Sequence, residues 1–84
     1  VLISCKALDI KKGLMESNEP ESIIKRQMIE QAQKSILLAD STKFDKTAFT
    51  KTCDLAQIDT IVTDKEPNIE WFDYIKENDI KLIY

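Results

Sequence analysis

Four short apolar runs, spread over the whole chain, are the feature that most constrains the fold. Each run is too short for a buried helix and is rich in residues that favour strands. The first is almost continuously apolar, which is typical of a strand buried on both faces of its sheet. The sequence therefore predicts four strands, at residues 1–5, 35–39, 60–63 and 80–84.

The segments between these runs differ in periodicity. Apolar residues recur at four-residue spacing in residues 20–34, which predicts an amphipathic helix that packs one face on something flat. A second helix is expected over residues 69–78, and a short one over residues 45–51. Residues 6–18 show no sustained period and are expected to form a loop, with at most a helical turn. The stripe of the first helix comprises Ile23, Ile24, Met28, Ile29 and Ala32.

The order of these elements predicts the fold class. Strands that alternate with helices indicate an α/β fold, with a parallel sheet of about four strands flanked by helices. Crossovers in such sheets are right-handed, so the topology is largely fixed. A length of 84 residues is that of one domain or part of one.

Composition excludes several classes of function. The chain has no histidine and two cysteines that form no CxxC motif, so we expect neither a metal site nor a cofactor. A net charge of −3 does not suit nucleic-acid binding by this segment. No apolar run approaches the roughly 20 residues that span a bilayer, so we expect no membrane partner. Free cysteines fit a reducing, cytoplasmic setting.

Two of the expected strands run directly into an aspartate. Asp40 follows residues 35–39 and precedes Lys43, and Asp64 follows residues 60–63. Ligands of open parallel sheets bind beyond the carboxyl ends of the strands, so Asp40 could accept hydrogen bonds from hydroxyls and Lys43 could hold a phosphate. The same residues are also ordinary turn and cap chemistry, which is the favoured interpretation for Asp64.

The first expected helix carries a second group of charges. Glu21 and Lys25 lie one turn apart, the usual spacing of a surface ion pair. A helix N-terminus near a sheet edge can also hold an anion, so Glu21, Lys25 and Arg26 are further candidate site residues.

Several phrases together resemble one protein family. ESIIKRQMI at residues 21–29, LADSTKF at residues 38–44 and IDTIVTD at residues 58–64 follow Ser4-Cys5 and Gly13-Leu14 in order. In this order they resemble the C-terminal effector-binding domain of DeoR-family transcriptional regulators, over nearly all 84 residues.

The resemblance implies a function that composition does not show. Such regulators bind DNA through an N-terminal winged helix-turn-helix and carry a Rossmann-like sensor related to sugar-phosphate isomerases. The sensor binds a phosphorylated sugar or similar metabolite, without catalysis. By this resemblance Asp40, Lys43, Glu21 and Lys25 are expected to bind the effector. Residues 1–84 would be the latter part of the sensor, and the upstream half and the DNA-binding domain would lie outside them.

Two other functions share the expected fold. A sugar-phosphate isomerase would need a general base, for which Asp40 or Glu21 is available. A receiver-like domain would need a clustered acidic pocket early in the chain, where only Asp9 occurs. The unpaired edges of a partial sheet favour association, so a homo-oligomer is expected.

Overall fold

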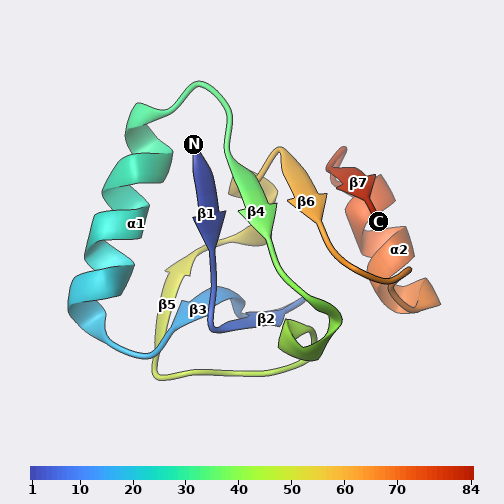
Figure 1. Cartoon of the computed structure of the whole chain (residues 1–84), viewed down its shortest axis with the longest axis horizontal. Helices are drawn as coiled ribbons and strands as arrows, with labels where there is room; N and C mark the ends of the chain where they lie inside the picture. The colour runs from blue at the N-terminus through green and yellow to red at the C-terminus, as the bar shows by residue number, and fades with distance from the viewer.

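The computed structural model describes residues 1–84 and contains the predicted parallel sheet (Figure 1). Its strand order is β1-β4-β6-β7, with all neighbours parallel. The α/β fold and the four parallel strands are therefore confirmed. The strands are β1 (Leu2–Ser4), β4 (Ile36–Leu38), β6 (Thr60–Val62) and β7 (Lys81–Ile83).

A second, antiparallel sheet was missed by the sequence analysis. It consists of β2 (Ala7–Asp9), β3 (Gly13–Glu16) and β5 (Thr50–Cys53), in the order β2-β3-β5. Residues 6–18 are thus a hairpin and not a loop, and residues 45–51 contain the start of a strand and no helix.

Local turn chemistry explains the hairpin. The Asp9 carboxylate accepts hydrogen bonds from the Lys11 and Lys12 amides, at 3.1 and 2.9 Å. Gly13 then takes φ of +86°, a conformation that L-residues other than glycine rarely adopt. Together these features reverse the chain between two three- to four-residue strands that are too short to show a period.

Two α-helices and two 3₁₀ turns complete the fold. Each α-helix begins with an asparagine cap, because the Asn18 side chain accepts from the Glu21 amide and the Asn68 side chain from the Trp71 amide. Neither helix is long and apolar enough to cross a membrane. The elements are α1 (Glu19–Gln31), η1 (Ser41–Lys43), η2 (Leu55–Gln57) and α2 (Ile69–Glu77).

Helix α1 packs through polar side chains, which corrects the predicted apolar stripe. The Ser22 hydroxyl and the Arg26 guanidinium donate to the Lys51 carbonyl, at 3.1 and 3.0 Å, and Arg26 Nε donates to the Thr52 carbonyl. These carbonyls lie on β5, which is an edge strand and has no neighbouring strand on one side. Donors from α1 therefore bind carbonyl groups of β5 that would otherwise lack a hydrogen-bond partner in the sheet. Within the stripe only Ile29 is buried, whereas Ile24 is 58 % exposed.

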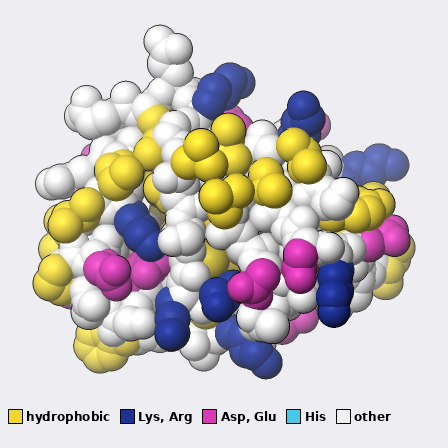
Figure 2. Space-filling model, viewed as in Figure 1, with side chains coloured by type: hydrophobic (Ala, Val, Ile, Leu, Met, Phe, Trp, Pro, Cys, Tyr) yellow, Lys and Arg dark blue, Asp and Glu magenta, His cyan; other side chains and the backbone are white.

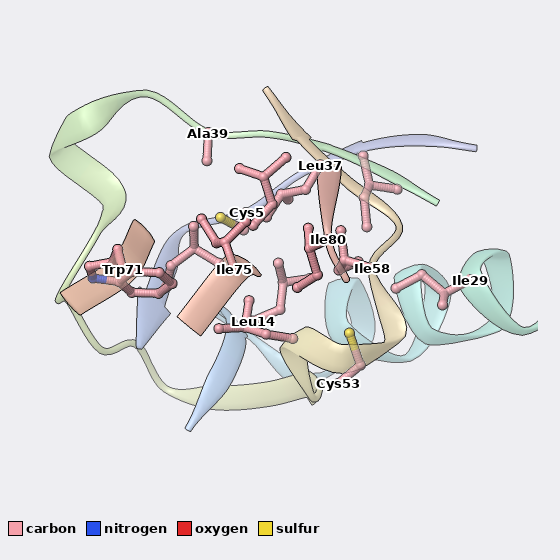
Figure 3. Close-up of a cluster of buried hydrophobic side chains, with 14 residues drawn as sticks. Cys5, Leu14, Ile29, Leu37, Ala39, Cys53, Ile58, Trp71, Ile75 and Ile80 are labelled. Atoms are coloured by element: carbon pink, nitrogen blue, oxygen red, sulfur yellow. The ribbon is translucent and has the colours of Figure 1, made fainter. Parts of the chain in front are cut away.

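The hydrophobic core lies between the parallel sheet, the antiparallel sheet and α2 (Figure 3). Ile3, Leu37 and Ile61 form one row across the inner face of the parallel sheet. They pack against the buried Leu14 of β3 and Trp71 of α2. Only one face of the parallel sheet contributes to this core, and its outer face retains exposed apolar side chains.

We predict that Gly13→Ala destabilises the chain by at least about 2 kcal/mol. An alanine Cβ would press against the backbone oxygen of Cys53, and its φ of +86° would add strain. Urea unfolding measures the loss. Ser17→Ala, at an exposed position of the same segment, is the control and should change stability by less than about 0.5 kcal/mol. Equal stability of the two variants would contradict the turn geometry.

Candidate functional site

The carboxyl ends of β1, β4 and β6 meet at one edge of the parallel sheet (Figure 1). This is the edge at which open α/β sheets bind ligands. A shallow hollow of about 400 Å³ lies there. It is lined by Leu38, Ala39, Asp40, Val62, Thr63 and Asp64, so the two strand-end aspartates are brought together as their sequence positions suggested.

Asp40 both caps the following turn and pairs with Lys43. Its Oδ1 accepts from the Thr42 amide at 2.9 Å and from the Thr42 hydroxyl. Its Oδ2 lies 3.7 Å from Lys43 Nζ. The hydrogen bonds from Thr42 lower the pKa of Asp40, and the charge of Lys43 adds to this effect. Asp40 is therefore a stable carboxylate with one oxygen committed to the turn.

Asp64 holds the same turn from the neighbouring strand. Its Oδ1 accepts from the Ser41 amide at 2.7 Å, which joins the end of β6 to the start of η1. The Ser41 hydrogen bond is the main cause of a lowered Asp64 pKa. Asp64 is therefore not only the first residue of the turn that follows β6. It also fixes the turn after β4, which carries Asp40 and Lys43.

Lys25 reaches the end of β1 from α1. Its Nζ donates to the Ser4 carbonyl at 2.8 Å and to Glu16 Oε2 at 2.9 Å. Glu16 is almost completely buried at the end of β3. Glu21 instead accepts a 3.3 Å hydrogen bond from Asn18, so the expected Glu21–Lys25 pair is replaced by Glu16–Lys25.

Glu16 is a residue of this edge that sequence reasoning missed. It lies in the segment that was expected to be a loop, and no periodicity marks it as buried. The one sequence feature that indicates its role is a carboxylate nine positions before Lys25. This spacing indicates an ion pair only when β3 is known to lie beside α1.

Charged side chains of the Glu16–Lys25 pair and of the Asp40–Lys43 pair act on the Cys5 thiol. Burial raises the pKa of Cys5 to about 12, and the charge of Glu16 adds to the increase, whereas Lys25 and Lys43 oppose it. The thiol is therefore a poor nucleophile. Lys25 approaches the end of β1 from α1 and Lys43 approaches it from the turn after β4, while the Glu21 carboxylate accepts its hydrogen bond from Asn18.

The side chains at this edge can offer hydrogen bonds and positive charge to a ligand. No three histidine, cysteine or acidic side chains lie close enough to hold a metal ion. Asp40 offers a hydrogen-bond acceptor, and Lys25 and Lys43 offer cationic donors. Figure 2 shows positive and negative side chains alternating below the central hydrophobic patch, so neither sign dominates this face.

A parallel α/β sheet with polar side chains at its carboxyl edge is the architecture of the Rossmann-like class. Within this class, residues 1–65 match the family model of the DeoR C terminal sensor domain. The chain belongs to this family.

Curated relatives agree with the family. The chain is 34 % identical over 82 residues to the L-fucose operon activator of Haemophilus influenzae, covering 98 % of this chain and 33 % of the relative. It is 35 % identical over 71 residues to the HTH-type transcriptional repressor GlcR of Bacillus subtilis, covering 84 % and 28 %. It is 32 % identical over 81 residues to the Escherichia coli deoxyribose operon repressor, covering 96 % and 32 %. The chain thus spans about a third of their length.

We predict that acid weakens the turn held by Asp40 and Asp64. Their folded-state pKa values lie below the ordinary 3.8, so their contribution to stability is present above that value and is lost as the pH falls through the lowered pKa. Urea unfolding between about pH 6 and pH 2 measures this dependence. Asp64→Asn should be less stable at pH 6 and show a flatter acid dependence. An unchanged acid slope in this variant would contradict the assignment.

Proposed function

We propose that residues 1–84 form the latter part of the effector sensor of a bacterial DeoR-family transcriptional repressor. The effector is a phosphorylated sugar or a related metabolite, and its binding changes the affinity of the whole protein for DNA. The observation that carries the proposal is the Asp40–Lys43 pair at the carboxyl edge of the sheet. The names of two relatives, which refer to fucose and deoxyribose operons, support a sugar-related effector.

The Asp40–Lys43 pair is suited to exchange for a ligand. Both side chains are partly exposed, and their 3.7 Å separation is long for an ion pair, so little stability is lost when Lys43 turns away. Lys43 would bind the phosphate, which frees Asp40 Oδ2 to accept from a sugar hydroxyl. Asp40 Oδ1 would remain with Thr42, so the turn keeps its shape during the exchange.

Lys25 and Glu21 would form the side of the site next to α1. Lys25 uses two of its three donors, on Ser4 and Glu16, and retains one for an anionic ligand. Glu21 keeps one carboxylate oxygen without a side-chain partner. Glu21 lies in the first turn of α1, the end of the helix that favours anions, and Lys25 lies one turn further on, at the middle of the helix.

The signal would pass from the turn to α2. Trp71 Nε1 donates to Asp45 at 2.8 Å, and the Trp71 ring packs edge-on against Phe44 with ring centroids 4.8 Å apart. Phe44 and Asp45 directly follow the turn that carries Lys43. A ligand that binds this turn with different affinities in two assemblies of the protein would shift the populations of these assemblies. This difference in affinity is the physical requirement for regulation.

The proposed protein is a cytoplasmic regulator and not an enzyme. The relatives are named as regulators, and DNA binding would belong to an N-terminal winged helix-turn-helix outside residues 1–84. A sugar-phosphate isomerase would need Asp40 or Glu21 as a general base. The lowered pKa of Asp40 makes it a weaker base, and the names of the relatives as regulators favour the sensor over this alternative.

We predict that one phosphate ester binds the intact protein and that Lys43→Ala weakens its binding about 10- to 100-fold. This range corresponds to the loss of one charge-assisted hydrogen bond of about 1.5–3 kcal/mol. Calorimetric titration with fructose, tagatose, galactitol and glycerol phosphates, beside the unphosphorylated compounds, measures binding. Asp40→Asn should also weaken it.

Lys46→Ala is the matched control for this titration, because Lys46 is exposed and lies three residues beyond Lys43. It should bind the ester like wild type. If Lys43→Ala and Asp40→Asn fold normally and bind as tightly as Lys46→Ala, the two residues are turn chemistry only and the site assignment is wrong. Turnover of an ester by the wild type would favour the isomerase.

We further propose that the regulator is a homo-oligomer in which α1 contacts another copy. Ile23, Ile24 and Met28 are 42, 58 and 40 % exposed, because the polar side of α1 faces the sheet. Ile24→Lys should therefore reduce the mass of the assembly in light scattering. Ile69→Lys, at a 75 % exposed isoleucine of α2, is the control and should leave the mass unchanged. A monomeric wild type would contradict the proposal.

A further inference from the structure

The Glu16–Lys25 ion pair is more buried and more tightly held than the Asp40–Lys43 pair. The Glu16 side chain is 4 % exposed and that of Lys25 is 18 % exposed, compared with 51 % for Asp40 and 34 % for Lys43. Lys25 Nζ lies 2.9 Å from Glu16 Oε2, whereas Lys43 Nζ lies 3.7 Å from Asp40 Oδ2. Lys25 is therefore held in one place, while Lys43 is able to change partners.

Three elements meet at the Lys25 ammonium group (Figure 1). Helix α1 carries the lysine, β3 ends at Glu16, and β1 ends at Ser4, whose carbonyl accepts from Nζ at 2.8 Å. Ser4 is the register partner of Leu38, which lines the hollow at the carboxyl edge. Lys25 Nζ therefore lies at the border of the candidate site, and two of its three donors are already in use.

The positive charges at this edge are balanced by negative charges in two pairs that are not equivalent. Burial is the largest influence on the pKa of the Cys5 thiol, and the charges of Glu16, Lys25, Lys43 and Asp40 act on it as well, so all four groups lie around the end of β1. Asp40 can release Lys43, because water or a ligand can then solvate its exposed carboxylate. A buried carboxylate that loses its cation is strongly disfavoured, so Glu16 keeps Lys25 when a ligand binds.

We propose that Glu16 is a specificity-determining residue of the effector site, which admits a neutral oxygen of the ligand at Lys25 and excludes a second phosphate there. This inference rests on the proposed effector site. A ligand oxygen that accepts from Lys25 Nζ would lie about 5 Å from the Glu16 carboxylate, because each is one hydrogen bond away from Nζ. At this distance the buried negative charge repels a phosphate but not a hydroxyl or carbonyl oxygen.

The two lysines therefore divide the recognition of the effector. The phosphate binds Lys43, whose counter-ion can be displaced, and an uncharged oxygen of the sugar binds Lys25. A sugar that carries a phosphate at both ends would bring the second one to a lysine whose counter-ion is fixed. A like charge placed against an unwanted ligand is a general means of specificity. The effector class that fits this arrangement is a sugar with one phosphate.

Calorimetric titration of the intact protein with matched monophosphates and bisphosphates tests this inference. The probes are the 6-phosphates and the 1,6-bisphosphates of fructose, glucose and tagatose. We expect the wild type to bind a monophosphate at least about ten-fold more tightly than the bisphosphate of the same sugar. Glu16→Gln keeps the shape of the side chain and removes its charge, so this ratio of affinities should fall at least about ten-fold in the variant.

Two further variants separate the charge of Glu16 from other effects. Glu30→Gln is the matched control, because Glu30 is an exposed carboxylate near the C-terminal end of α1 and its replacement removes the same charge from the protein. It should keep the wild-type ratio. Glu16→Asp retains the charge on a shorter side chain and should still discriminate against the bisphosphate, which a role in packing alone does not predict.

A wild type that binds a bisphosphate as tightly as the monophosphate would overturn the proposal, and this comparison needs no variant that could fail to fold. An unchanged ratio in folded Glu16→Gln would also overturn it and would show that the shape of the site excludes the second phosphate. In both cases, weaker monophosphate binding by Lys43→Ala would still support the proposed effector site. Failure of every monophosphate to bind would instead count against both proposals.

Discussion

The hydrogen bond from the Ser41 amide to Asp64 is the interaction on which the candidate site depends. Parallel strands bring their carboxyl ends to one edge, but the loops that follow them are free to diverge. This bond joins the end of β6 to the turn after β4, and the cap formed by Asp40 with Thr42 then shapes that turn. Lys43 is thereby held at the edge of the sheet, close to Asp40. The two aspartates at the ends of β4 and β6 therefore shape and fix this turn, and this structural role does not depend on which ligand binds.

The second half of the site depends on an unusual helix contact. Ser22 and Arg26 bind carbonyls of β5, which fixes the rotation of α1 about its axis. This rotation directs Lys25 toward the end of β1 and leaves the apolar residues of α1 uncovered. The antiparallel sheet therefore serves the site indirectly, because β5 orients the helix and β3 supplies Glu16 as the partner of Lys25. The same hydrogen bonds therefore determine both where Lys25 points and which apolar residues of α1 are exposed.

Sequence patterns predicted the parts of the fold in which apolar side chains decide the structure. The four parallel strands and α2 were predicted because apolar residues dominate the strands and recur on one face of α2, and the place of Asp40 and Asp64 followed from the strand order. The antiparallel sheet was missed because β2 and β3 are too short to show a period and β5 has the polar sequence Thr50–Cys53. The face of α1 was misassigned because a hydrophobic pattern cannot reveal that polar donors are needed by an edge strand. Glu16 was missed because β3, on which it lies, is too short to show a period and was expected to be a loop.

An effector that binds at the turn held between Asp40 and Asp64 should change the environment of that turn's backbone amides. The most direct measurement is a backbone amide NMR titration of the intact protein with a phosphorylated sugar that binds it. We expect the largest shift changes at Ser41, Thr42 and Lys43, with smaller changes at Trp71 through its contacts with the end of the turn. A second groove lies beside α2 and is lined by Asp9, Glu70, Asp73 and Glu77, among others. Changes confined to this groove, with Ser41 and Thr42 unaffected, would show that the effector binds elsewhere.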